Sequence, residues 1–337
     1  MELTFVDLFA GVGMARMGME QAGFKCVYTC EFNKYKRKEY EIIHGNTPEG
    51  CDIRDVRAAD IPRSNVWFFG APCQDFSLAG LRKGLGGERS SLVGEVFRLI
   101  EEKAEDKPEW LVYENVKGML SSNNGWDFLS ILLTMDGLGY DIEWQTINSK
   151  DFGVPQNRER VYTIGHLRAK GSKQILPITA DDRQTDKLRK QVISNTITAR
   201  YGESESRGTY IVCDENKPHE IKRSCKTESG REPLIIQRSH GFNKGTLTKI
   251  APTLTKSSYH ENNLIAKANF DGKKYTIRKL TPKECMRLQG VPDEYTDKLI
   301  QAGISDSQIY KAGGDGLTVP IAKEIGERIR KTYIEGE

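Results

Sequence analysis

One cysteine lies in a setting that suits a nucleophile. Cys73 belongs to the run Gly70-Ala71-Pro72-Cys73-Gln74, which directly follows the apolar stretch from Val66 to Phe69. An apolar run of this length predicts a buried strand, and open α/β sheets bind their ligands at the carboxyl ends of strands. A lone cysteine is most often a small buried apolar residue. This one follows a proline and precedes a polar loop, which favours an exposed, nucleophilic thiol.

The loop after Cys73 is rich in glycine and carries several cations. Its glycines and cations are Gly80, Gly84, Gly86, Gly87, Arg82, Lys83 and Arg89. Glycine permits backbone conformations that other residues disfavour, and cations attract a polyanion. We therefore expect a basic lid that closes over the site.

Two further polar segments are placed to take part in chemistry. Glu114-Asn115-Val116 ends the apolar run that begins at Trp110. A buried carboxyl beside a reacting base can hold or donate a proton if its pKa is raised. In the segment from Gln156 to Arg160, Arg158 and Arg160 alternate, so they share one face if the backbone is extended. A surface ion-pair cluster is the alternative interpretation of that segment taken alone.

A glycine turn and two carboxylates predict a nucleoside pocket. The run Asp7-Leu8-Phe9-Ala10-Gly11-Val12-Gly13 joins a predicted strand to a predicted helix, whose first N–H groups suit a carboxylate or phosphate. Glu31 ends the second predicted strand, where a carboxylate can bind both ribose hydroxyls. Asp52-Ile53 lies where a third strand is expected to end, and its carboxylate can accept an adenine amino proton. Gly18 follows Gly13 by five residues rather than three, which disfavours a pyrophosphate site.

Strand and helix signals alternate through the first half of the chain. The predicted strands cover residues 3–9, 25–30, 66–69, 110–113 and 160–165, and the predicted helices cover residues 14–22, 33–44, 92–103 and 126–138. Such alternation is typical of a doubly wound, mostly parallel α/β sheet. Near the C-terminus, Thr281-Pro282-Lys283-Glu284 predicts a helix start, and residues 319–331 predict a last amphipathic helix.

The composition changes near Arg168. From there to Tyr275 the chain carries 21 basic and 12 acidic side chains, a net charge of +9, whereas the remainder carries 29 and 35, a net charge of −6. Short strand-like runs between polar turns predict a small, irregular, β-rich domain over residues 168–275. Its charge indicates a polyanionic partner, and an exposed basic face without a partner is the alternative. Residues 1–167 and 276–337 are predicted to form one α/β domain that this insert interrupts.

The composition excludes several classes of protein. The 337 residues suffice for one large domain or two modest ones. The longest apolar stretches are only a few residues, whereas a membrane helix needs about 20. The first residues lack the basic and apolar regions of a secretory signal. Seven cysteines without a CxxC pair predict neither a disulfide framework nor a structural zinc site, so a reducing cytoplasm is expected.

In their order and spacing, these segments resemble the C5-cytosine-specific DNA methyltransferases over essentially the whole chain except the basic insert. The resemblance rests on six blocks, namely Asp7-Leu8-Phe9-Ala10-Gly11-Val12-Gly13, Pro72-Cys73-Gln74, Glu114-Asn115-Val116, Gln156-Asn157-Arg158-Glu159-Arg160, Arg278-Lys279-Leu280-Thr281-Pro282-Lys283-Glu284 through Arg287-Leu288-Gln289-Gly290, and Gly313-Gly314-Asp315-Gly316-Leu317-Thr318-Val319-Pro320. Two positions depart from the family pattern. Ala71 stands where the family often has an aromatic residue, and Asp315-Gly316 replaces its common Asn-Ser, whose Asn supports the cofactor side.

The resemblance implies a Rossmann-like methyltransferase sheet, S-adenosylmethionine as cofactor, S-adenosylhomocysteine as product, and no metal. It implies a cofactor site made by Phe9, Ala10, Gly11, Gly13, Glu31, Phe32, Asp52, Ile53, Pro72, Asp315 and Leu317. It implies catalytic roles for Cys73, Glu114, Arg158 and Arg160, with Cys73 as the nucleophile. DNA contacts are expected from Gln74, Ser77, Arg82, Lys83 and Arg89, and the basic insert is expected to recognise the target.

The function implied is methylation of carbon 5 of a flipped-out cytosine in a short motif of double-stranded DNA, through a covalent Cys73 adduct. A restriction-modification or phage anti-restriction system is the expected setting. The chain is expected to be a monomer in a prokaryotic cytoplasm, associated with the nucleoid and without membrane contact, and a cognate restriction endonuclease is a candidate partner. Two alternatives stay open. A tRNA cytosine-5 methyltransferase tends to carry a Cys-Phe-Thr signature, which this chain lacks. A catalytically inactive DNA-binding homologue is disfavoured by the intact Cys73, Glu114 and Arg160.

Overall fold

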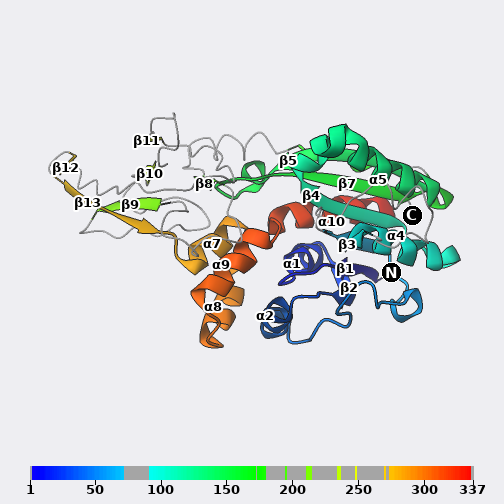
Figure 1. Ribbon diagram of the computed structural model, residues 1–337, viewed down its shortest axis with the longest axis horizontal. Coiled ribbons are helices and arrows are strands. Elements are labelled where there is room, and N and C mark those ends of the chain that lie inside the picture. Colours follow the sequence, from blue (N-terminus) through cyan, green and yellow to red (C-terminus); the bar gives the residue numbers. More distant parts are fainter. Residues whose placement is uncertain are drawn as a thin grey trace. The chain divides into compact units, whose positions relative to one another are not determined.

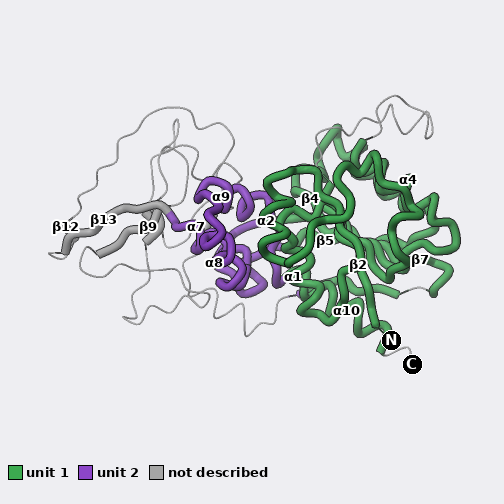
Figure 2. The backbone as a smooth tube through the Cα atoms, turned by 90° about the horizontal axis from the view of Figure 1, so that it is seen from below, with its two compact units in different colours: residues 1–147, 159–178, 321–337 green, residues 148–158, 179–320 purple. Residues whose placement is uncertain are grey.

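The structure is a computed structural model of the chain, and it divides into two compact units (Figure 2). Unit 1 comprises Met1–Ile147, Glu159–Ile178 and Ile321–Glu337, and unit 2 comprises Asn148–Arg158 and Thr179–Pro320. The structure describes residues 2–71, 91–171, 173–179 and 280–334 in full, and the backbone of short strands between residues 194 and 279. The predicted domain boundaries, at 167/168 and 275/276, follow composition rather than packing and stay a prediction.

Unit 1 is built on a six-stranded sheet with the order β2-β1-β3-β4-β7-β5. Its strands are β1 (Leu3–Leu8), β2 (Phe24–Cys30), β3 (Val66–Phe69), β4 (Trp110–Val116), β5 (Tyr140–Asn148) and β7 (Glu159–Leu167). Strand β1 pairs in parallel with β2 and β3, and β3 with β4, whereas β4 and β7 are antiparallel. The predicted doubly wound α/β sheet is therefore confirmed. Strand β5, which was not predicted, lies at one edge.

Helices cover both faces of this sheet (Figure 1). They are α1 (Met14–Gln21), α2 (Lys34–His44), α4 (Leu92–Glu102), α5 (Trp126–Gly137) and α10 (Val319–Ile334), with short 3-10 helices at Ala58–Asp60, Ala104–Asp106, Lys117–Gly125, Ser149–Phe152 and Arg168–Lys170. One face of the sheet forms a continuous apolar core with α4 and α5. Helix α10 packs on α1, where a Cβ at Gly326 would meet Ala22 and Met19. Among the described helices, none has the length and apolarity required to span a bilayer.

Two predicted strand ends differ from the structure. Strand β4 continues through Val116 because β7 pairs with it as far as Val116↔Arg160, so Glu114 and Asn115 lie within the strand. The prediction that a third strand ends at Asp52 is wrong. Residues 51–57 form a turn, and the segment before them contributes one isolated parallel bridge, Cys30↔Gly50.

Residues 173–178 run beside β5 and are held by side chains of unit 1. The Glu143 carboxylate accepts from the N–H of Ile175 at 2.7 Å, and the Gln145 amide both donates to and accepts from the backbone of Ile178. The Arg328 guanidinium donates to the carbonyls of Ile175 and Pro177. These bonds fix the chain where it leaves unit 1.

The part of unit 2 that the structure describes contains three α-helices and several short strands. The helices are α7 (Pro282–Leu288), α8 (Asp293–Gln301) and α9 (Asp306–Asp315). A five-stranded antiparallel sheet has the order β11-β10-β9-β13-β12, and β6 (Gln156–Asn157) pairs with β8 (Ser194–Asn195). The bounds are Tyr210–Asp214 for β9, Leu234–Ile236 for β10, Leu247–Thr248 for β11, Asn269–Phe270 for β12 and Lys273–Lys279 for β13. The predicted start of α7 is confirmed, since Thr281 and Glu284 form a reciprocal capping box.

Candidate functional site

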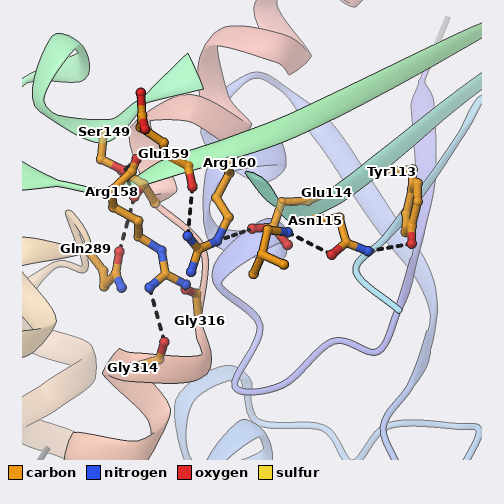
Figure 3. A network of polar contacts seen from close by, with 12 residues as sticks. Tyr113, Glu114, Asn115, Ser149, Arg158, Glu159, Arg160, Gln289, Gly314 and Gly316 are labelled. Atoms are coloured by element: carbon orange, nitrogen blue, oxygen red, sulfur yellow. Dashed lines mark hydrogen bonds and ion pairs between the residues drawn. The ribbon is translucent and has the colours of Figure 1, made fainter. Parts of the chain in front are cut away.

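The end of strand β4 holds an ion pair with its neighbour β7. The Arg160 Nε lies 3.2 Å from the Glu114 Oε1, and 15% of each side chain is exposed to solvent. Figure 3 shows the guanidinium pointing at the carboxylate. The antiparallel register that pairs Glu114 with Tyr162 sets both side chains at this edge of the sheet. The pair is partly accessible, so a polar ligand can contact both groups.

The neighbouring Asn115 ties this edge to the segment that leads to Cys73. Its amide nitrogen donates to the Ala71 carbonyl at 3.3 Å and to the Tyr113 hydroxyl, and the side chain is buried. A Cβ built on Gly70 would lie 3.4 Å from the Glu114 Oε2. The last two residues before Pro72 therefore lie directly beside Glu114 and Asn115.

A second group of residues lies at the carboxyl ends of β1 and β2. The Gly11 N–H donates to the Glu31 Oε2 at 2.7 Å, and the Asn33 N–H donates to the Glu31 Oε1 at 2.7 Å. Gly13 has a φ of +80°, and a Cβ there would lie 2.1 Å from the His44 Nε2, so only glycine fits. The turn and the carboxylate are thereby fixed against each other. Each Glu31 oxygen has lone pairs beyond the one that its backbone donor uses.

Three more of the predicted cofactor residues, Phe32, Asp52 and Ile53, differ in exposure. Phe32 is 68% exposed, whereas Ile53 is buried. Asp52 accepts hydrogen bonds from the Arg54 guanidinium, which hold the pKa of this carboxyl below its ordinary value. An exposed aromatic ring and an ionised carboxylate are groups that an adenosine can use.

Asp7 is a buried carboxylate that sequence reasoning passed over as a site residue. It lies in β1, is 2% exposed, and its Oδ2 has no hydrogen-bond partner among the residues that the structure describes. Burial raises the pKa of the Asp7 carboxyl to about 8, the nearby Arg16 opposes this shift, and the charge of Glu31 adds to it. The group is therefore largely protonated at neutral pH.

Arg158 belongs to unit 2 and is fully enclosed there. Its guanidinium donates to the carbonyls of Gly314 at 3.2 Å and Gly316 at 2.7 Å, and the residue is 3% exposed (Figure 3). Asp315, which lies between these glycines, is exposed, and Leu317 is half-buried. The expected extended run from Gln156 to Arg160 is broken at Arg158, because β6 and β7 belong to different sheets.

Several predicted residues lie outside the part of the chain that the structure describes. They are Pro72, Cys73, Gln74, Ser77, Arg82, Lys83 and Arg89, together with the proposed lid. Within the described residues, no group of three or more His, Cys, Asp or Glu side chains is arranged to hold a metal ion. The sequence did not predict that Asn115 holds the Ala71 carbonyl or that the Gln289 amide donates to the Gly313 carbonyl, although both residues lie in the blocks that carried the resemblance.

Comparison with known proteins identifies the family. The model of the C-5 cytosine-specific DNA methylases matches residues 3–331. The type II methyltransferase M.Bsp6I of Bacillus sp. (strain RFL6) is 31% identical over 342 residues, which cover 98% of this chain and 100% of that protein. M.HhaI of Haemophilus parahaemolyticus is 32% identical over 334 residues, covering 97% and 94%.

Solved structures agree on the fold. The methyltransferase EhMeth of Entamoeba histolytica superposes with a TM-score of 0.61 at 15% identity, covering 99% of each chain. The Dnmt2 methyltransferase of S. pombe gives a TM-score of 0.60 at 17% identity, covering 98% and 99%. At these identities the likeness concerns the fold alone. The family match spans nearly the whole sequence, and the chain belongs to the S-adenosylmethionine-dependent C-5 cytosine-specific DNA methylases, enzymes that act on DNA.

Proposed function

We propose that this enzyme methylates carbon 5 of a flipped-out cytosine in a short DNA motif through a transient bond between Cys73 and carbon 6 of the base. The observation that carries the proposal is the grouping of Glu114, Arg160 and Asn115 beside Gly70 and Ala71. Chain connectivity keeps the Cα of Cys73 within about 7 Å of the Cα of Ala71, whose carbonyl Asn115 holds. A carboxyl and a guanidinium thus meet at the sheet edge beside which the chain leads toward Cys73.

Each of these groups has a task in the reaction. The Cys73 thiolate adds to carbon 6, and the ring electrons move to carbon 5, which becomes nucleophilic. Glu114 shares a proton with ring nitrogen 3, which relieves the negative charge that builds up on the ring. Arg160 orients Glu114 and donates to the ring carbonyl, for which a guanidinium is suited. Once carbon 5 has taken up the methyl group, it loses its proton to a base and the Cys73 thiolate leaves carbon 6, which restores the aromatic ring.

The residues at the ends of β1 and β2 fit S-adenosylmethionine. When bound, the cofactor supplies the electrophilic methyl group that carbon 5 takes up. Glu31, oriented by Gly11 and Asn33, has lone pairs for the two ribose hydroxyls, and the exposed Phe32 offers a ring to the adenine. The further proposed cofactor residues are Phe9, Ala10, Gly13, Asp52, Ile53, Pro72, Asp315 and Leu317. No metal has a task in this scheme.

The proposed target is double-stranded DNA, in which the cytosine face that Cys73 attacks becomes accessible only when the base leaves the helix. The basic region from residue 168 to residue 275 carries a net charge of +9, which suits phosphate contacts. Gln74, Ser77, Arg82, Lys83 and Arg89 would contact the DNA near the flipped base. The type II names of the relatives support a role in restriction-modification, with a cognate endonuclease as partner.

Bisulfite sequencing of a plasmid after expression of the chain tests the proposal. We expect protected cytosines in one or a few short motifs, and none with Cys73→Ser. Cys51→Ser is a matched control, since the Cys51 thiol is free and exposed. The purified protein is expected to form a covalent complex with duplex DNA that contains 5-fluorocytosine, and Cys73→Ser is expected to form none.

Other outcomes would identify the alternatives. Unmodified cytosines throughout, together with specific DNA binding and no covalent complex, would show an inactive DNA-binding homologue. Label from radioactive cofactor that enters tRNA and not duplex DNA would show an RNA enzyme. Persistent methylation by Cys73→Ser would overturn the covalent mechanism.

A further inference from the structure

The C-terminal end of helix α9 leaves main-chain carbonyls that the helix itself does not satisfy. The helix ends at Asp315, and the last four carbonyls of any α-helix lack an intrahelical donor. Here three carbonyls around the helix end receive side-chain donors instead. The Gln289 amide donates to Gly313 at 2.6 Å, and the Arg158 guanidinium donates to Gly314 and Gly316. Arg158 and Gln289 therefore act as C-terminal caps, and a cation is favoured at that end of a helix.

Buried polar side chains support these two caps from behind. The Gln289 Oε1 accepts from the Thr318 hydroxyl at 3.1 Å and from the Gln156 amide at 3.2 Å. The Thr318 hydroxyl lies 2.7 Å from the Ser149 hydroxyl. All of these residues are at most 3% exposed. A buried network of this kind favours one geometry, because displacing one of these members leaves further buried polar groups unsatisfied.

Arg158 is held at its own backbone as well. Its N–H donates to the Asn148 Oδ1 at 3.2 Å, and its carbonyl accepts from the Ser149 N–H at 2.9 Å. The Arg158 backbone is thus held in place, and its guanidinium reaches the carbonyls of the two residues on either side of Asp315. Gly314 and Thr318 are buried, whereas Asp315 and Leu317, which lie between them in the sequence, are exposed and half-buried. The network fixes the backbone and leaves these two side chains at the surface.

We infer that Arg158 is a positioning residue for the cofactor side of the site, and that it acts through the backbone of residues 314–316 rather than on the cytosine. The inference rests on the proposed function, in which Asp315 and Leu317 take part in binding S-adenosylmethionine. It separates Arg158 from Arg160, which has a carboxylate partner at the edge of the unit 1 sheet. The resemblance alone grouped both arginines as catalytic.

Two conservative variants give opposite expectations. Lysine keeps the charge of Arg158 but cannot donate to two carbonyls in the fixed geometry of a guanidinium. Arg158→Lys is therefore expected to raise the dissociation constant of S-adenosylhomocysteine, measured by calorimetry without DNA, by roughly tenfold or more. Its KM for S-adenosylmethionine should rise in parallel, and its kcat at saturating cofactor should stay within about threefold of the wild type. Arg160→Lys should leave the S-adenosylhomocysteine affinity unchanged and lower kcat.

The reverse pattern would overturn the inference. If Arg158→Lys binds S-adenosylhomocysteine like the wild type and loses kcat, Arg158 acts on the base. Gln289→Met removes the donor to Gly313 and carries the same expectation as Arg158→Lys, so it replaces that variant if the lysine protein does not fold. A wild-type protein that binds S-adenosylhomocysteine but methylates no DNA would refute the proposed function and leave the binding comparison intact.

Discussion

Arg158 and Arg160 are separated by one residue, and their surroundings are opposite in kind. The Arg160 guanidinium faces the Glu114 carboxylate in unit 1, where both side chains keep some exposure to solvent. The Arg158 guanidinium is enclosed in unit 2 and donates to two main-chain carbonyls. A guanidinium beside a partly exposed carboxylate can exchange part of that contact for a ligand. One that caps buried carbonyls cannot leave them without unsatisfied groups.

The same contrast separates two carboxylates at the ends of neighbouring strands. Glu31, directly after β2, has two backbone N–H donors that orient its oxygens. Asp7, in β1, has an oxygen without a partner among the described residues, and burial raises its pKa to about 8. The two N–H donors orient the Glu31 oxygens so that they can accept further hydrogen bonds from a ligand, whereas Asp7 stays mostly neutral.

Within this comparison, the largest loss of kcat is expected from Glu114→Gln, which tests whether the pair of Glu114 and Arg160 takes part in catalysis. Glutamine keeps the shape of the side chain but cannot share a proton with the base. We expect kcat to fall by about 10² to 10⁴, measured as the initial rate of methyl transfer at saturating cofactor and DNA. Glu159→Gln is the matched control, because Glu159 begins the neighbouring strand β7 and pairs with Lys117 in an exposed contact. A Glu114→Gln enzyme with the kcat of the wild type would remove Glu114 from the mechanism.

A double-mutant cycle sharpens the comparison further. If Glu114 and Arg160 act as one unit, Glu114→Gln and Arg160→Met each lose most of the activity and the double variant loses little more. The expected coupling in log kcat/KM then equals most of one single loss, which corresponds to about 3 kcal/mol or more. The exposed pair of Lys117 and Glu159 should give a coupling near zero. Additive losses at Glu114 and Arg160 would mean that the ion pair is incidental to catalysis.

The contrast between the two arginines marks how far the sequence could lead. Apolar runs predicted β1, β2, β3 and most of β4, because parallel strands that are buried on both faces appear in the sequence as nearly continuous apolar runs. The pattern missed β5, whose polar and apolar residues mix at the sheet edge. It could not separate Arg158 from Arg160, because the cap on Gly314 and Gly316 joins residues more than 150 positions apart in the sequence.

The site residues divide in the same way. Glu31 was predicted from its place at a strand end, a local property of the sequence. The anchoring of Ala71 by Asn115 depends on the register between β3 and β4, which local spacing does not encode. Asp7 looked like part of an apolar strand, and its raised pKa follows from burial in the fold, with smaller influences from Arg16 of α1 and from Glu31 after β2.

Glu31→Gln tests whether Glu31, the carboxylate that two N–H groups orient, binds the cofactor. A glutamine side chain can accept from only one of the two N–H groups of Gly11 and Asn33, and its own amide then faces the other donor. We expect the dissociation constant of S-adenosylhomocysteine to rise about tenfold, as measured by calorimetry. Glu49→Gln is the control, since Glu49 accepts from the backbone N–H of Thr29, two residues before Glu31. Equal affinities of Glu31→Gln and the wild type would exclude Glu31 from the cofactor site.

The smallest effect on methyl transfer is expected from substitution of the other carboxylate, Asp7. Its substitution is therefore tested by protein stability rather than by ligand binding. The pKa of Asp7 is about 8 in the folded chain and near 4 when unfolded, so the folded state binds more protons between these values. Its contribution to stability is thus complete below pH 4 and is lost as the pH rises to 8. Asp7→Asn removes this dependence. The free energy of unfolding of the variant, relative to the wild type, should therefore increase from pH 5 to pH 8 by roughly 3 to 4 kcal/mol. Urea unfolding at both pH values measures it, with the exposed Glu101→Gln as control. A difference that shrinks with rising pH would mean that Asp7 is ionised and paired in the folded protein, and that the contrast with Glu31 does not hold.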